Sequence, residues 1–116
     1  MVIVTARLVF ETQEHRDKAV VASTDIQAAT REEEAGCYMY CFAPDPCVPT
    51  EIQVYELWED AASLAEHFKH PNYAAMVAAL GSAGGLVASI NRQYVADDRG
   101  TVYDDNQNPR TDALLD

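Results

Sequence analysis

Apolar positions along the chain change their spacing several times, and each spacing predicts one element. Residues 2–10 carry apolar side chains at every second position, which predicts a β-strand. Residues 14–34 place apolar side chains three and four positions apart, which predicts an amphipathic helix, and Gly36 follows where such a helix commonly ends. The inward positions of this helix are expected to be Ala19, Ala22, Ile26 and Ala29.

Two more strands are predicted in the middle of the chain, at residues 37–43 and 52–59. Prolines interrupt sheet pairing between them, so the two strands are expected to form a hairpin with a loop. In the first strand, alternation sets Cys37, Met39 and Cys41 against Tyr38, Tyr40 and Phe42. In the second strand, one face holds Ile52, Val54, Glu56 and Trp58.

Two helices and a final strand are predicted after this hairpin. Asp60 suits the N-cap of the first helix, and Pro71 suits the first turn of the second. A glycine-rich turn ends the second helix, and residues 86–95 then read as a strand. The inward positions are expected to be Ala61, Leu64, Ala65 and Phe68 in the first helix and Tyr73, Met76, Val77 and Leu80 in the second.

The order strand, helix, strand, strand, helix, strand predicts an α+β fold of the ferredoxin-like βαββαβ type. In this fold the helices cover one face of an antiparallel sheet. Every predicted strand nevertheless carries apolar or aromatic side chains on both faces. Because the open side of a monomeric antiparallel sheet is normally polar, we expect a second copy to cover it, sheet against sheet. The pattern therefore predicts a homodimer.

The composition changes abruptly near residue 97, where Asp, Asn, Arg, Gly and Thr become dominant. We therefore divide the chain into a domain of residues 1–97 and a polar, acidic C-terminal tail of residues 98–116. The tail is expected either to be mobile or to lie over a partner subunit.

The charge of the chain argues against two classes of partner. Among 116 residues, 19 are acidic and 8 are Lys or Arg, for a formal net charge of −11. Binding to nucleic acid or to an anionic membrane surface depends on Lys and Arg, so we expect neither. The N-terminus lacks the pattern of a signal peptide, and no stretch of about 18 apolar residues occurs. We therefore expect a cytoplasmic protein.

Three cysteines stand close together, at Cys37, Cys41 and Cys47. The first two are four residues apart on one predicted strand face, roughly 13 Å along an extended chain, which is too far for a disulfide. Their spacing also lacks the paired pattern of a zinc site. We expect reduced cysteines, with Cys37 and Cys41 in the core, and no metal.

The most specific pattern begins at Gly36. A Gly-Cys-Tyr-Met-Tyr strand starts there, a Tyr-Glu-Leu-Trp-Glu-Asp run ends at Asp60, and a helix carrying His67 ends near His70. In these residues the chain resembles the antibiotic biosynthesis monooxygenase family, over roughly residues 2–95. The resemblance implies a dimeric α+β barrel built from two ferredoxin-like subunits. It also implies oxygenation of phenolic or quinol-like substrates without a metal or flavin cofactor.

Trp58 and His67 are the leading candidates for catalysis. A strand that ends at Trp58 and the helix that follows place both side chains on neighbouring walls of one cavity. His67 falls about 60° from the centre of the apolar stripe of its helix, where it can reach a cavity without being buried. Its unperturbed pKa near neutrality suits it to take a phenolic proton. The alternatives are a core tryptophan and a half-exposed surface histidine.

Glu56 is the third candidate, because a carboxylate on an apolar face needs a partner. Arg92 is expected either to pair with it or, by resemblance to anthrone oxygenases, to hold the anion of a deprotonated substrate. Tyr73 and Met76 are expected to shape a dry slot for the substrate.

These features favour a homodimeric, cofactor-independent monooxygenase of an electron-rich aromatic such as a quinol, hydroxyquinol or anthrone. The alternative is a dimer that binds a small ligand or is purely structural, because one fold hosts many functions. Haem degradation is a third possibility within the family. The resemblance would then require an asparagine in the first strand, where this chain reads Thr5-Ala6-Arg7.

Overall fold

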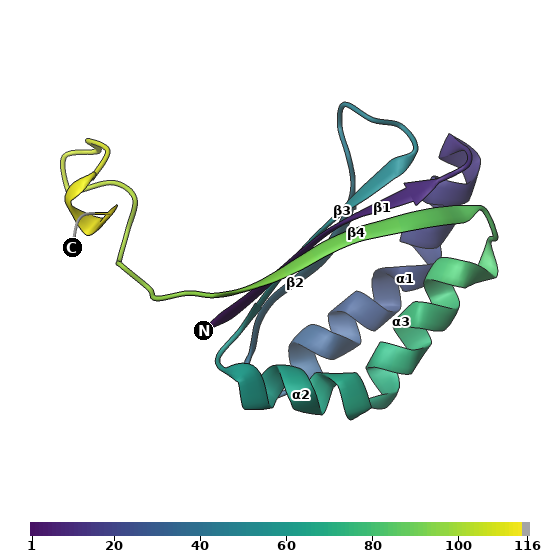
Figure 1. The fold of residues 1–116 in the computed structure, drawn as a ribbon, viewed down its shortest axis with the longest axis horizontal. Helices are drawn as coiled ribbons and strands as arrows, with labels where there is room; N and C mark the ends of the chain where they lie inside the picture. The colour runs from purple at the N-terminus through teal and green to yellow at the C-terminus, as the bar shows by residue number, and fades with distance from the viewer. Residues whose placement is uncertain (115–116) are drawn as a thin grey trace.

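The computed structural model describes residues 1–114 and places three helices on one face of a four-stranded antiparallel sheet (Figure 1). This arrangement confirms the ferredoxin-like α+β fold. In chain order the elements are β1 (Val2–Phe10), α1 (Gln13–Glu33), β2 (Cys37–Pro44), β3 (Glu51–Trp58), α2 (Ala61–Lys69), α3 (Pro71–Ser82), β4 (Leu86–Val95) and the 3-10 helix η1 (Asp112–Leu114).

The strands lie in the order β2-β3-β1-β4, and every neighbouring pair is antiparallel. The expected hairpin of β2 and β3 is confirmed. In this register Val4 of β1 lies between Glu56 of β3 and Gln93 of β4, so all three residues belong to the helix-covered face. The apolar core lies between this face and the helices, and its largest buried side chains include Phe10, Tyr40, Phe42, Ile52, Trp58 and Met76.

Helix α1 buries a more polar face than its apolar spacing indicated. The expected inward residue Ala22 is exposed, whereas Ser23, Gln27 and Thr30 are buried. Gln27 explains the difference, because its side-chain amide donates to the carbonyl of Phe42 at 3.1 Å and accepts from the Phe42 N–H at 2.8 Å. Helix α1 thus satisfies backbone groups of β2, an edge strand.

A β-bulge in β2 corrects the expected alternation. The register shifts between Cys37 and Met39, so that Cys37 opposes Trp58 on the helix face while Cys41 opposes Tyr55 on the other face. The two cysteines therefore lie on opposite faces rather than on one. Cys37 is partly buried against the core, and all three cysteines are free thiols.

The sheet face away from the helices, here called the open face, carries exposed apolar side chains. They are Met39, Tyr55, Ile90 and Tyr94. Strand β4 has no fully buried residue along its length. After β4 the chain leaves the sheet and forms a bridge between Tyr103 and Pro109, and this segment lies away from the helices (Figure 1). Residues 115–116 of the predicted tail lie outside the described residues.

Within residues 1–114, none of the helices combines the length and the apolar character needed to cross a lipid bilayer. The cytoplasmic location stays a prediction.

Candidate active site

A cavity of about 690 Å³ lies between the helix-covered face of the sheet and the helices α2 and α3. Its volume is that of typical small-molecule sites, and most of its lining is apolar or aromatic. Five of the six residues singled out from the sequence border it, namely Glu56, His67, Tyr73, Met76 and Arg92.

His67 reaches this cavity from the last turn of α2. Asp60 begins that helix by accepting the N–H of Ser63 at 2.8 Å, which confirms the expected N-cap. The side chain of His67 is only 2% exposed. The alternative of a half-exposed surface histidine is therefore wrong, and so is the expectation that His67 reaches the cavity without being buried. His67 is buried because Glu34 and the rings of four aromatic residues surround it.

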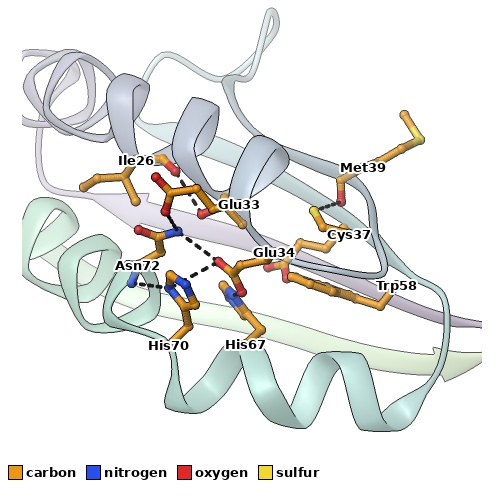
Figure 2. Close-up of polar contacts among 11 residues, drawn as sticks. Ile26, Glu33, Glu34, Cys37, Met39, Trp58, His67, His70 and Asn72 are labelled. Atoms are coloured by element: carbon orange, nitrogen blue, oxygen red, sulfur yellow. Dashed lines mark hydrogen bonds and ion pairs between the residues drawn. The ribbon is translucent and has the colours of Figure 1, made fainter.

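Glu34 is the direct partner of His67. Its Oε1 lies 2.7 Å from Nδ1 of His67, and its side chain is 5% exposed (Figure 2). A carboxylate accepts hydrogen bonds, so this contact places the imidazole proton on Nδ1 and leaves Nε2 as the basic nitrogen. Nε2 has no hydrogen-bond partner within the described chain, in which every fully buried polar side-chain atom has one, so Nε2 is not fully buried. His67 lines both this cavity and a hollow between the end of α1 and α2.

Two residues at the start of α3 support Glu34. Asn72 donates from Nδ2 to Oε2 of Glu34 at 3.2 Å, while its backbone N–H donates to Nδ1 of His70 at 3.0 Å (Figure 2). His70 therefore caps α3. Because Nδ1 of His70 accepts that bond, it presents no proton to Glu34, whose Oε2 lies 3.8 Å away. Within the described chain, His67 and Asn72 are thus the side-chain donors to Glu34.

Aromatic rings enclose the imidazole of His67. The ring of Trp58 lies 4.6 Å away and is tilted by 33°, and the rings of Tyr40 and Tyr73 stand edge-on at 5.4 and 5.6 Å. Trp58 is fully buried and does not line the cavity. It supports His67 from behind rather than forming a wall that a substrate would touch.

Trp58 also provides the partner that Glu56 requires. Its Nε1 donates to Oε1 of Glu56 at 3.0 Å. Burial raises the pKa of the Glu56 carboxyl to about 7, although the bond from Trp58 opposes this shift and the nearby Glu34 adds to it. The expected pair of Glu56 with Arg92 is wrong. Arg92 opposes Thr5 in the register, a position of the open face, and its side chain donates to the carbonyl of Asn91. It still borders the cavity, because β4 is an edge strand, and its expected role in holding a substrate anion stays a prediction.

Tyr40 is a cavity residue that the sequence analysis did not single out. Its side chain is 1% exposed, and burial together with the carboxylates of Glu56 and Glu34 raises the pKa of its phenol far above the ordinary value. Its hydroxyl has no partner in the described chain, so by the same reasoning as for His67 it is not fully buried, and Tyr40 lines this cavity. Tyr40 is therefore a neutral hydrogen-bond donor at neutral pH.

The sequence held a signal for each of the two missed residues. Tyr40 and Phe42 alternate along β2 with residues of the open face. The pairing of β2 with β3 therefore puts them on the helix-covered face, which also holds Trp58. Glu34 stands just before the Gly36 turn, but it is the last of three consecutive glutamates. The sequence alone does not tell which of the three is buried. Among residues 1–114, no group of three or more His, Cys, Asp or Glu side chains could hold a metal ion.

A comparison with models of protein families shows which family the chain belongs to. A family model described as antibiotic biosynthesis monooxygenase matches residues 1–79. The chain belongs to the antibiotic biosynthesis monooxygenase family. The match covers β1 to α3 and therefore includes Glu34, Tyr40, Glu56 and His67. A search of curated proteins finds no match.

Solved structures show the same fold at low sequence identity. A structure from Deinococcus radiodurans assigned to the antibiotic biosynthesis monooxygenases is 23% identical, with a TM-score of 0.76 over 90% of this chain and 100% of that chain. One from Caulobacter crescentus is 18% identical, with a TM-score of 0.72 over 84% and 91%. SnoaB of Streptomyces nogalater, described as a cofactor-independent oxygenase, is 12% identical, with a TM-score of 0.61 over 84% and 93%.

Proposed function

We propose that this protein is a cofactor-independent monooxygenase of an electron-rich aromatic substrate, such as a quinol, hydroxyquinol or anthrone. The observation that carries the proposal is the buried pair of Glu34 and His67 at the wall of an aromatic cavity. A histidine held by a carboxylate is a general base in a fixed orientation. The chain belongs to a family of monooxygenases, and this supports oxygenation as the reaction that the base would begin.

The first step is removal of a proton from the substrate. Nε2 of His67 takes the proton of a phenolic O–H or of an acidic C–H, and the bonding electron pair stays on the substrate. Glu34 stabilises the imidazolium that forms, because its carboxylate lies 2.7 Å from Nδ1. The aromatic rings around His67 keep water away from the charge, which strengthens this interaction.

The substrate anion then supplies the electrons. One electron passes to dioxygen, and the resulting superoxide and substrate radical combine into a peroxide. His67 returns its proton to this peroxide. The hydroperoxide then loses water: the O–O bond breaks, the hydrogen that remains on the same carbon leaves as a proton and joins the departing hydroxide, and its electron pair forms the C=O bond of the product. For an anthrone, the sum is substrate plus dioxygen giving quinone plus water. Met76 and Tyr73 line the cavity beside His67 and would hold the flat ring system in place.

A second copy of the chain would cover the open face. Tyr55, Ile90 and Tyr94 are exposed there, and β4 has no fully buried residue on either face. Exposed apolar patches of this kind are typical of protein interfaces, and a second copy brings an apolar face of the same chemistry. We therefore propose a homodimer packed sheet against sheet.

Oxygen uptake tests this function. The purified protein would be assayed with a panel of reduced quinols and with anthrone, corrected for autoxidation in buffer. We expect uptake that His67→Gln lowers by ~10²-fold or more, since this is the typical contribution of a general base. His15→Gln is the matched control, because His15 lies at the start of α1, outside the cavity, and should retain full activity. Tight binding of aromatic compounds without uptake would instead favour the ligand-binding alternative.

A further inference from the structure

The tail after β4 folds into a small hairpin whose apolar side chains are exposed. Within residues 102–110, here called the C-terminal hairpin, the N–H of Arg110 donates to the carbonyl of Val102 at 2.7 Å, and Tyr103 forms a bridge with Pro109. The hairpin lies away from the helices (Figure 1). Val102 and Tyr103 are 66% and 54% exposed. Because an isolated two-stranded hairpin is at best marginally stable in water, this one is expected to pack against another surface.

A groove of about 410 Å³ between α2 and the end of β4 offers such a surface. Its lining is mostly apolar and includes Val2, Leu64, Ala65, Phe68 and Val95. Phe68 and Val95 are exposed there. Phe68 and Gln93 also line the candidate active-site cavity, so a segment that fills the groove covers one side of that cavity.

The course of the chain after β4 favours the groove of a second copy over the groove of the same copy. The N–H of Ala96 donates to the carbonyl of Met1 at 2.8 Å, and the amino group of Met1 donates to the carbonyl of Ala96 at 3.0 Å. These bonds continue the pairing of β1 with β4, so the chain leaves along the strand direction, away from its own helices (Figure 1). In the proposed homodimer a second sheet lies about 10 Å from the open face. Residues 97–101 can span roughly 17 Å, so the hairpin can reach the other subunit.

We infer that in the homodimer the C-terminal hairpin of each copy packs into the groove between α2 and β4 of the other copy and closes the cavity on that side. The partner's Tyr103 then lies over Phe68, whose ring centroid is 6.0 Å from that of His67 and 5.3 Å from that of Tyr73. An apolar cover at this point keeps water away from His67. The inference rests on the proposed homodimer and not on oxygen chemistry.

Photo-crosslinking between isotopically distinct copies tests it. Tyr103 would be replaced by p-benzoylphenylalanine in protein made with nitrogen-14 and with nitrogen-15, and native mass spectrometry would establish that mixed dimers form before irradiation. We expect cross-linked peptides that join position 103 of one copy to Phe68 or Val95 of the other, with one light and one heavy member. The same probe at Val21 is the matched control, because Val21 is exposed on α1, and it should give no such peptide.

Hydroxyl-radical footprinting tests the cover over the cavity without any ligand. In the unmodified dimer the ring of Phe68 should be protected from oxidation. In the double variant Val102→Ala with Tyr103→Ala its oxidation should rise several-fold, because the apolar side chains that shield it are gone. Val21→Ala is the control and should leave Phe68 protected. Circular dichroism and sedimentation would establish that each variant is folded and dimeric.

The outcomes separate this inference from the proposed function. Cross-links to the groove that join only residues of one chain would show that the hairpin folds back on its own subunit, and this would overturn the inference. Cross-links to another surface, a monomeric protein, or equal oxidation of Phe68 in the double variant and the unmodified protein would overturn it as well. None of these measurements involves turnover, so oxygen uptake decides the monooxygenase independently.

Discussion

At the scale of single residues, the proposed proton transfer depends on the carboxylate of Glu34. It fixes the proton of His67 on Nδ1, and Asn72 fixes the carboxylate in turn. Without Glu34, the imidazole proton could lie on either nitrogen of His67, so the nitrogen that faces the substrate would be basic in only part of the molecules. Glu34 is therefore a positioning residue, which acts on a substrate only through His67.

Glu34→Gln should separate this role from a structural one. We expect kcat for oxygen uptake to fall by ~10-fold or more with little change in KM, because a residue behind the base affects proton transfer rather than substrate binding. Nitrogen-15 NMR of His67 should show a single tautomer in the unmodified protein and a mixture of tautomers in the variant. The control is Glu33→Gln, which removes an exposed neighbouring carboxylate. An unchanged tautomer in Glu34→Gln would contradict the assigned role.

The raised pKa of Glu56 predicts how stability varies with pH. The carboxyl has a pKa of about 7 in the folded protein against 4.5 ordinarily, so the folded state binds more protons between these values. The free energy of unfolding should therefore be highest at the low-pH end of this window and fall as pH rises through about 7, by roughly 3 kcal/mol in total.

Urea unfolding at about pH 5 and about pH 8 measures this loss. Glu56→Gln cannot ionise at this position and keeps an acceptor for Trp58, so the variant should lose less stability than the unmodified protein over the same interval. Equal losses in both proteins would show that Glu56 is not held in its protonated form.

The turn after α1 is the feature at the scale of elements that brings Glu34 to His67. Gly36 has a φ of +80°, and a Cβ atom there would collide with the side chain of Ser63 in α2. The close approach of these two elements therefore requires glycine. The same approach places the end of α1 beside α2, where Glu34 and His67 meet.

Gly36→Ala should destabilise the protein by about 2 kcal/mol, because it combines an unfavourable backbone conformation with a steric clash. Gly81→Ala is the matched control. A Cβ atom at Gly81 would have no neighbour within 4 Å, and the residue sits in α3, so this change should be neutral or stabilise by up to ~1 kcal/mol. Thermal or urea unfolding compares the two. A loss of the same size in both variants would contradict the requirement for close approach at Gly36.

The sequence predicted the elements well because their signals are local. Strand alternation, the Asp60 cap and Pro71 at the start of α3 each depend on a few neighbouring residues. The buried face of α1 and the bulge in β2 could not be predicted this way. Gln27 is buried because it bonds to Phe42, 15 residues away, and Cys37 changes face because of the strand beside it. The expected pairing of Arg92 with Glu56 failed for a different reason, since strand alternation does not tell which face meets the helices.

The uncovered sheet is the main feature at the scale of the whole molecule. The helices cover one face of the sheet (Figure 1). The other face carries exposed apolar side chains. A double substitution on β4, Ile90→Asp with Tyr94→Asp, would place two carboxylates in the proposed interface between copies. We expect the dimer to dissociate, as measured by sedimentation equilibrium, because buried unpaired charges are strongly unfavourable.

Val21→Asp is the control for this experiment. Val21 is an exposed residue of α1, on the opposite side of the molecule from the open face, so the dimer should persist. An unmodified protein that sediments as a monomer at all concentrations would contradict the proposed interface.

The most direct test of the central claim is a mass-spectrometric product analysis under oxygen-18 gas. With anthrone as substrate, the account predicts one oxygen-18 atom in each product molecule and the second in water, at a rate that His67→Gln and Glu34→Gln both reduce and His15→Gln does not. Product that gains its label as fast in His67→Gln as in the unmodified protein would show that the buried pair of Glu34 and His67 is not the catalytic base.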